Sequence, residues 1–307
     1  MQHDARSIPS GSLLQPDVCI LGAGPVGIAV GLTLARAGAR VLLLEAGGRE
    51  AQAMDRRHAG GESVGEPYVP LHRSRVRGFG GTSLHWLNVG LFRATPLDPL
   101  DFETRAGIPH SGWPISRTDL DPYYAQAVSW CGLGESDFSV KRWETPKRAA
   151  LQFSDDSVRT VVFQRAAIDQ WKQRFAEVTG TTGLDLVLHA HVVGMHADAA
   201  GTRIARLTVR TTSGTAFTVE PRAVVLATGG IENARMLLAN RDRFPNGLGN
   251  GHDLVGRFFQ EHLAIRGGII RPTHPELARD LGLYYPHVAE DGTPIHAKLA
   301  VGEHVLR

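Results

Sequence analysis

Cysteine is scarce in this chain of 307 residues, since only Cys19 and Cys131 are present. Two cysteines so far apart in the sequence provide no disulfide framework, which favours a reducing compartment. Cys19 lies within an apolar run and is typical of a small core residue. The cysteines therefore indicate neither a disulfide-stapled domain nor a thiol-based centre.

Long apolar runs and an excess of one charge are also missing. No stretch of 18 apolar residues occurs, and residues 1–15 hold no apolar stretch of secretory length. The 33 Lys and Arg residues nearly balance the 31 Asp and Glu residues, so the charge indicates neither a nucleic-acid partner nor a strongly acidic one. We therefore expect a cytoplasmic protein with no membrane span and no nucleic-acid partner.

Histidine is the one abundant residue type with metal-binding chemistry, at fourteen residues. His189, His191 and His196 lie close together in a strand-like stretch, but a zinc site also needs convergent ligands and supporting residues around them. Nothing else in the sequence supplies these, so no metal site is expected. No Ser, His and Asp context of a nucleophilic enzyme stands out either.

Two short apolar runs flank a helical pattern near the start of the chain. Residues 17–21 and 40–44 are strand-like, and between them Val26, Val30 and Leu34 recur every four residues. Gly38 ends this pattern, as glycine commonly does after a helix. A strand, a helix and a strand within about 30 residues predict a βαβ unit with buried parallel strands.

The turn between the first strand and the helix carries a glycine fingerprint. In residues 22–27, Gly22 permits a tight turn, Gly24 lets the backbone approach a pyrophosphate, and Gly27 lets helix and strand pack closely. The helix start offers N–H groups and a positive dipole end to that anion. Glu45 follows 18 residues after Gly27, where a carboxylate can bind ribose hydroxyls. The fingerprint predicts a dinucleotide site and leaves both NAD and FAD open.

The later sequence completes an α/β pattern. Residues 184–226 alternate in strand fashion around two polar turns, which predicts a β-meander ending in a buried strand at residues 223–227. Residues 113–130 predict a turn and a helix capped by Asp119 or Asp121, with Pro122 at its first position. The expected fold class is therefore α/β, with a Rossmann-like domain built from the βαβ unit and the β-meander.

Several segments, in order, resemble the glucose–methanol–choline (GMC) oxidoreductase family, above all its pyranose oxidase-like, sugar-oxidising branch. They are the fingerprint at 22–27, Arg-Val-Arg-Gly-Phe-Gly-Gly-Thr-Ser-Leu-His-Trp at 75–86, Gly-Trp-Pro-Ile at 112–115 with Asp-Pro-Tyr-Tyr at 121–124, Val-Val-Leu-Ala-Thr-Gly-Gly-Ile-Glu-Asn-Ala-Arg-Met-Leu-Leu at 224–238, and Gly-Asn at 249–250 with Asp-Leu-Val-Gly-Arg at 253–257. The resemblance implies that the dinucleotide is FAD. It also implies hydride transfer from a CH–OH carbon of a sugar, polyol or other alcohol to the flavin.

The fingerprint and the resemblance together imply cofactor-binding residues from four parts of the chain. They are Gly22, Gly24, Gly27, Glu45 and Ala46 in the βαβ unit, Arg77, Gly80, Gly81, Thr82, His85 and Trp86 in a second glycine loop, Val192 in the β-meander, and Ala227, Gly229 and Asn233 after the last parallel strand. A glycine-rich loop can bring backbone N–H groups against phosphate or flavin atoms. The strand of Val192 is expected to touch adenine through its backbone.

His85 carries the sharpest local hypothesis. In pyranose oxidase-like sequences, a histidine before a tryptophan in this context is bonded covalently to the flavin ring methyl. The resemblance therefore implies a histidyl–FAD link at His85, next to Trp86. The alternative is a histidine that packs beside the flavin or in the core.

The resemblance leaves the catalytic residues unassigned. In the family, the catalytic histidine and its partner come late in chains considerably longer than this one. We therefore expect a partial family member whose catalytic segment comes from a missing C-terminal part or from a second chain. His262 is given no catalytic role, and His296 and His304 are candidates by residue type alone.

Two alternative functions stay open at this point. One is a non-catalytic FAD-binding remnant or regulatory subunit, and the other is an NAD-dependent dehydrogenase that uses the fingerprint alone. The electron acceptor, whether oxygen, a quinone or a cytochrome, is undecided. Residues 14–130 and 184–262 are assigned to a discontinuous FAD-binding domain, and residues 131–183 and 263–307 to an incomplete α+β substrate domain. The last residues, 295–306, are expected to form a strand with an exposed edge.

Overall fold

The computed structural model describes residues 1–50, 59–84, 92–166, 170–260, 271, 273–274 and 281–306. The chain divides into two compact units: unit 1 is Met1–Asn88 with Trp171–Leu263, and unit 2 is Val89–Gln170 with Ala264–Arg307. Residues 89–130 group with unit 2, unlike the expected domain bounds, because strand β5 (Phe92–Ala94) pairs with β6 (Val158–Ala166). Which unit binds which ligand stays a prediction.

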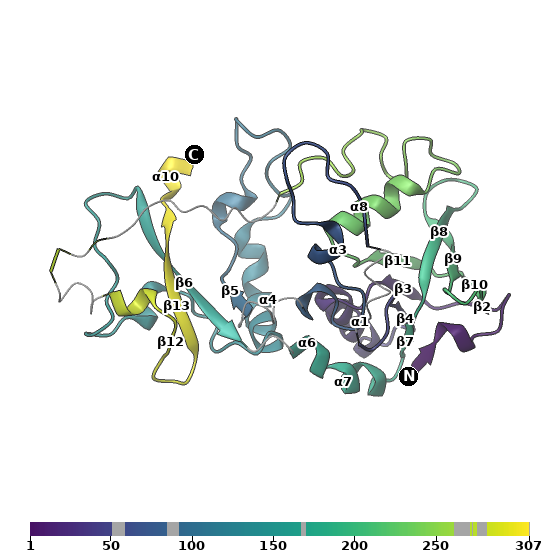
Figure 1. Ribbon diagram of the computed structural model, residues 1–307, viewed down its shortest axis with the longest axis horizontal. Helices are drawn as coiled ribbons and strands as arrows, with labels where there is room; N and C mark the ends of the chain where they lie inside the picture. Colours follow the sequence, from purple (N-terminus) through teal and green to yellow (C-terminus); the bar gives the residue numbers. More distant parts are fainter. Residues whose placement is uncertain are drawn as a thin grey trace. The chain divides into compact units, whose positions relative to one another are not determined.

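A five-stranded parallel sheet forms the centre of unit 1 (Figure 1). Its strands, in spatial order, are β1 (Gln2–Asp4), β7 (Leu184–Leu188), β4 (Val41–Leu44), β3 (Val18–Leu21) and β11 (Ala223–Leu226). Every neighbouring pair is parallel. The side chains of β4 are all buried, as expected of a parallel strand covered on both faces.

Helix α1 (Pro25–Arg36) covers one face of this sheet. Its buried side chains include Ile28 and Leu32, and a methyl group at Gly31 would contact Leu184 and Ile20 of the sheet. The predicted strand, helix and strand of the βαβ unit are thus confirmed, with bounds within one or two residues. Helix α7 (Phe175–Gly180) also contacts the sheet, through β7.

A second sheet covers the opposite face. Its strands, in spatial order, are β2 (Leu13–Leu14), β10 (Ala216–Val219), β9 (Ile204–Arg210) and β8 (His191–Ala197). Its antiparallel part is the predicted β-meander. The core between the layers joins Cys19 and Leu44 to Leu207, Phe217 and Met236, the last from helix α8 (Gly230–Ala239). The expected α/β, Rossmann-like fold class is confirmed.

Unit 2 is built on an antiparallel sheet of four strands. Their spatial order is β12 (His287–Val288), β13 (Pro294–Val301), β6 and β5. One face of the sheet packs on a core of Val162, Ile295 and Ala297 with Trp143 and Leu283. Figure 1 shows β6 and β13 side by side along most of their length.

The remaining helices complete the described chain. In unit 1 these are the 3-10 turn η1 (Ala5–Ser7) and helix α3 (Leu71–Ser74), with α6 (Gln170–Gln173) at the border of the two units. Unit 2 holds η3 (Pro99–Phe102), α4 (Arg117–Trp130), α5 (Val140–Trp143), η4 (Leu281–Tyr284) and α10 (Glu303–Leu306). In the part of the chain that the structure describes, no helix combines the length and apolar character needed to cross a membrane.

Two local predictions are wrong, and the strand expected at residues 295–306 is confirmed only as far as Val301. Helix α4 is capped by Ser116, which exchanges hydrogen bonds with Asp119 in a capping box, so Pro122 lies inside the helix. Strand β11 is only partly buried, because it is an edge strand of the parallel sheet. Strand β13 ends at Val301, where Gly302 donates to the Ser157 carbonyl oxygen and the chain turns into α10.

Candidate functional site

Two positions of the glycine fingerprint, Gly22 and Gly27, accept only glycine. Gly22 has a φ of +100°, and a methyl group there would lie 2.7 Å from the Ala227 carbonyl oxygen. At Gly27 a methyl group would overlap the Gly22 carbonyl oxygen. Gly24 is the N-cap of α1 and carries no side chain that could cap the first N–H groups of the helix. This end of the helix can therefore receive an anion.

The second glycine loop packs directly on this turn, although about 57 residues separate them in the sequence. Gly80 donates a 2.9 Å backbone hydrogen bond to the Ala23 carbonyl oxygen. A methyl group at Gly81, where φ is +57°, would lie 2.9 Å from the Cα atom of Gly24. The loop continues into a turn that includes Thr82, whose hydroxyl accepts from Val76 N–H at 3.4 Å. The predicted His85 and Trp86 lie outside the described residues.

Glu45 ties three loops together from the end of β4. Its Oε2 accepts a hydrogen bond from Ala23 N–H at 2.9 Å, and its Oε1 accepts from Gly47 and Gly78 N–H at 2.8 and 2.9 Å. Burial raises the pKa of Glu45, while the three N–H groups and Arg77 act in the opposite direction. The carboxylate thus faces the loop backbones. Among the described residues Oε2 accepts one hydrogen bond, so it keeps an acceptor position that the expected ribose contact would use.

Of the predicted residues after β11, Ala227 contacts the fingerprint at the carboxyl edge of the sheet. The Ala227 methyl group and the Ala227 carbonyl oxygen line the Gly22–Gly27 turn, and Gly229, with a φ of +88°, caps α8. Asn233 Oδ1 accepts from the Thr228 N–H at 3.0 Å and from its hydroxyl at 2.6 Å. Asn233 therefore braces the turn between β11 and α8.

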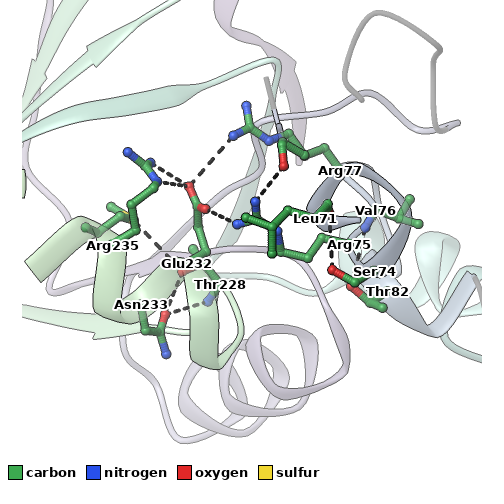
Figure 2. A network of polar contacts seen from close by, with 12 residues as sticks. Leu71, Ser74, Arg75, Val76, Arg77, Thr82, Thr228, Glu232, Asn233 and Arg235 are labelled. Carbon is green, nitrogen blue, oxygen red and sulfur yellow. Dashed lines mark hydrogen bonds and ion pairs between the residues drawn. The ribbon is translucent and has the colours of Figure 1, made fainter. Parts of the chain in front are cut away.

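A cluster of three arginines and one glutamate lies beside these loops, as Figure 2 shows. Glu232, in the first turn of α8, pairs with Arg75 at 2.5 Å, with Arg235 at 2.5 Å and with Arg77 at 3.7 Å. Arg75 also donates to the Ala59 carbonyl oxygen at 2.7 Å. We call these four residues the arginine cluster, and its formal charge is +2.

Burial controls the electrostatics of the arginine cluster. The side chains of Arg75 and Arg77 are 16% and 19% exposed, although arginines in this context are usually solvated. Burial lowers the pKa of Arg77, and Glu232 opposes that change. For Glu232, burial acts to raise the pKa, but Arg235, Arg75 and Arg77 outweigh it and the pKa falls. A partly buried excess of positive charge favours a bound anion.

Sequence reasoning missed Glu232 and Arg235. Their only local signal was an acidic residue in a helical first turn with an arginine three residues later, which many exposed helices share. Val192, by contrast, lies where expected on β8, pairs with Val209, and packs against the core of unit 1. Its adenine contact stays a prediction.

The surroundings of two further histidines, His196 and His189, are described by the structure. His196 contacts the Thr208 hydroxyl at 2.9 Å and Asp242 at 3.3 Å. His189 adopts a φ of +59° and its ring lies against Gly48. His262 lies outside the described residues, and His304 lies in α10. None of these placements assigns a catalytic base.

Taken together, three segments converge at the carboxyl edge of β4, β3 and β11, where ligands bind in open α/β sheets. The donors are backbone N–H groups and arginines, and the glycines remove the methyl groups that would fill the turn. This chemistry fits a dinucleotide with a diphosphate. It can hold and orient such a cofactor and balance its charge.

Comparisons with known proteins agree with this geometry. The family model described as "FAD dependent oxidoreductase" matches residues 17–279. A 2-methyl-1,2-propanediol dehydrogenase from Mycolicibacterium austroafricanum is 25% identical over 85% of this chain and 58% of its own length. The fructose dehydrogenase large subunit of Gluconobacter japonicus is 23% identical over 83% of this chain and 60% of its own length.

The chain thus spans about three fifths of the length of these two relatives. Among solved structures, the crystal structure of pyridoxine 4-oxidase from Mesorbium loti aligns with 73% of this chain and 51% of its own, at 18% identity and a TM-score of 0.46.

Proposed function

Because the chain belongs to the FAD-dependent oxidoreductase family, whose cofactor is FAD, we propose that it oxidises the CH–OH group of a small alcohol, polyol or sugar in the manner of GMC oxidoreductases. The observation that carries this proposal is the packing of the second glycine loop and the β11–α8 turn onto the fingerprint. Because the cofactor of this family is FAD, the nicotinamide-dependent alternative is set aside. An FAD site accounts for the fingerprint, the second glycine loop and the β11–α8 turn together.

The relatives support the substrate class. One is by name a dehydrogenase of 2-methyl-1,2-propanediol and the other is by name a fructose dehydrogenase, so both are named for small hydroxyl compounds. Neither name is carried over as this chain's substrate. The shared chemistry is the oxidation of a carbon that bears a hydroxyl group, and we propose this for the present chain.

The chain's own residues would bind and orient the cofactor. The first N–H groups of α1 and the Gly80–Gly81 backbone would hold the diphosphate, and Arg77 would balance part of its charge. Glu45 would keep these loops in place while its Oε2 contacts the adenosine ribose. When bound, FAD accepts the hydride from the alcohol carbon. No described residue is assigned the role of the base.

Two further elements belong to the proposal. His85, before Trp86, would be bonded through a ring nitrogen to the flavin ring methyl in place of one methyl hydrogen, and the two electrons released would reduce the flavin, which the enzyme's electron acceptor would then reoxidise. A second chain would contribute to the complete enzyme, as the name of the fructose dehydrogenase large subunit indicates for that relative. A non-catalytic FAD-binding subunit is the competing proposal.

Acid precipitation of the purified protein tests the cofactor and its attachment. We expect flavin absorption bands that stay with the pellet, and the His85→Ala variant should release the colour to the supernatant. His72→Ala, an exposed histidine of α3, is the matched control and should keep the colour in the pellet. Flavin in the wild-type supernatant would refute the covalent link but would still identify FAD as the cofactor.

Flavin reduction under anaerobic conditions tests the activity. 2-Methyl-1,2-propanediol, fructose and a panel of simple polyols would be added to the flavin-loaded protein, with and without a co-expressed neighbouring chain. Bleaching of the flavin by any of them supports alcohol oxidation. A flavin that none of them reduces in either sample supports the non-catalytic alternative.

A further inference from the structure

One face of the unit 2 sheet is unusually rich in positive charge. Side chains at Val161, Phe163 and Arg165 of β6 share this face, since side chains alternate along a strand. Phe163 lies opposite His296 and Val161 lies opposite Lys298. The other face of the same strands carries Val162, Ile295 and Ala297 and packs on the core.

The cations on this face directly oppose one another. Arg93 of β5 is the register partner of Arg165 of β6, and like charges in that position are destabilising. The Lys298 ammonium lies 5.6 Å from the centre of the Phe163 ring. Within the described residues, no ion pair joins Arg93, Arg165 or Lys298 to a carboxylate. The charge on this face is therefore not neutralised by that part of the chain.

His296 lies buried among these cations, with 5% of its surface exposed. Its ring stacks on Phe163 with centres 5.6 Å apart, and its buried Nδ1 has no hydrogen-bond partner among the described residues. The buried Nε of Arg165 is likewise unpaired there. Two buried nitrogen atoms without an acceptor, next to unpaired cations, indicate a polar group that the described residues do not supply.

Charge and burial keep His296 neutral. Burial first, and then Lys298, Arg93, Arg165 and His287, lower its pKa to about 4. Every charged group in that set is cationic, from all four strands of the sheet. His296 therefore senses the charge on this face, and a neutral ring can donate a hydrogen bond from Nδ1 in one tautomer.

We propose that this cationic face, formed by Arg93, Phe163, Arg165, His296 and Lys298, binds a compact oxoanion such as a carboxylate or phosphate group. Arginines bind such oxygens through paired N–H donors, and lysine adds a point charge. The site is small, because it spans only neighbouring positions on three strands around one buried ring. A compact group fits it better than an extended polyanion does.

This anion site would add to the proposed function, and its role in substrate binding rests on that function. If unit 2 binds the substrate, the substrate is an alcohol that carries a carboxylate or a phosphate, such as a hydroxy acid or a phosphorylated polyol. The binding of the anion itself requires neither flavin nor turnover. Anion binding and alcohol oxidation can therefore fail separately.

The test follows the His296 ring by NMR while inorganic phosphate or acetate is added at constant ionic strength, with chloride as the reference salt. Both flavin-loaded and flavin-free protein are used, and His296→Gln assigns the signal. We expect a saturable shift with phosphate or acetate and a rise of the His296 pKa by about one unit or more. A stronger response to one of the two identifies the preferred oxoanion.

Variants of the cations make the test specific. Arg165→Gln and Lys298→Gln should each lower the affinity for the anion by about tenfold or more. Without anion, Arg165→Gln should melt at the same or a higher temperature, because it removes the repulsion with Arg93. Lys141→Gln, an exposed lysine of α5, is the control and should leave the anion affinity unchanged.

The proposal is overturned by a His296 shift that chloride reproduces, by a shift that does not saturate, or by wild-type anion affinity in both Arg165→Gln and Lys298→Gln. A response confined to flavin-loaded protein would also overturn it, because the site would then belong to the cofactor. If the anion binds as expected and no alcohol is oxidised, the cationic face stands and the proposed function fails.

Discussion

Replacing Glu45 by alanine should destabilise unit 1 far more than the loss of a surface carboxylate. The substitution removes the acceptor of three N–H groups, those of Ala23, Gly47 and Gly78. Each buried donor left without a partner costs about 1–3 kcal/mol. The loops can relax and water can enter, so we expect a total loss of about 3–5 kcal/mol rather than the full sum. Native proteins have only about 5–15 kcal/mol of stability to lose.

Urea unfolding followed by far-UV circular dichroism at neutral pH measures this loss. Glu45→Gln keeps one acceptor oxygen and should therefore lose less than Glu45→Ala, although its NH2 group then faces a backbone N–H donor where the carboxylate accepted a hydrogen bond. Glu220→Ala, an exposed carboxylate of the same unit, should stay within about 0.5 kcal/mol of wild type. A Glu45→Ala protein as stable as Glu220→Ala would refute the view that this carboxylate holds the three loops.

Three further outcomes are expected. Gly27→Ala should cost about 2 kcal/mol or more by urea unfolding, because its methyl group overlaps the Gly22 carbonyl oxygen, whereas Gly180→Ala, with open space around it, should be neutral; equal stability of the two would contradict the packing. Glu232→Gln should lower the melting temperature by leaving Arg75 and Arg77 uncompensated, and FAD should raise it more than in wild type, which differential scanning fluorimetry can check. Stability should fall as the pH drops from about 6.5 towards 4, because the pKa of His296 is lowered to about 4 and the unfolded chain takes up the proton first. We expect about 1–2 kcal/mol from this group after allowing for solvent screening, and His296→Gln should remove that part of the slope.

The sequence was most informative where local pattern and local structure coincide. The strand, turn and helix around Gly22 and Gly27 follow from hydrophobic periodicity and from steric limits that act within a few residues. Only the family resemblance grouped the segments at residues 75–86 and 224–238 with the fingerprint, since their own periodicity does not predict that Gly81 contacts Gly24.

Features set by tertiary neighbours could not be predicted. Arg75 and Glu232 lie 157 residues apart, so their ion pair leaves no local signal. The apolar run of β11 is consistent with a buried strand, but the strand lies at the edge of its sheet, and only the order of the strands decides that. The cap of α4 differs from the prediction because two acidic residues, Asp119 and Asp121, follow Ser116 at plausible spacings.

The interruption of unit 1 by the segment Val89–Gln170 has a consequence for how the chain is made. Strands β3 and β4 with α1 can form early, but β7, which pairs with β4, begins about 140 residues after β4 ends. At about 5–20 residues per second, a ribosome needs roughly 7–30 s to supply it. During that time the apolar strand Val41–Leu44 has an open edge and no second covering layer. Slower growth at low temperature and abundant chaperones should therefore raise the soluble yield of this protein more than changes to its surface.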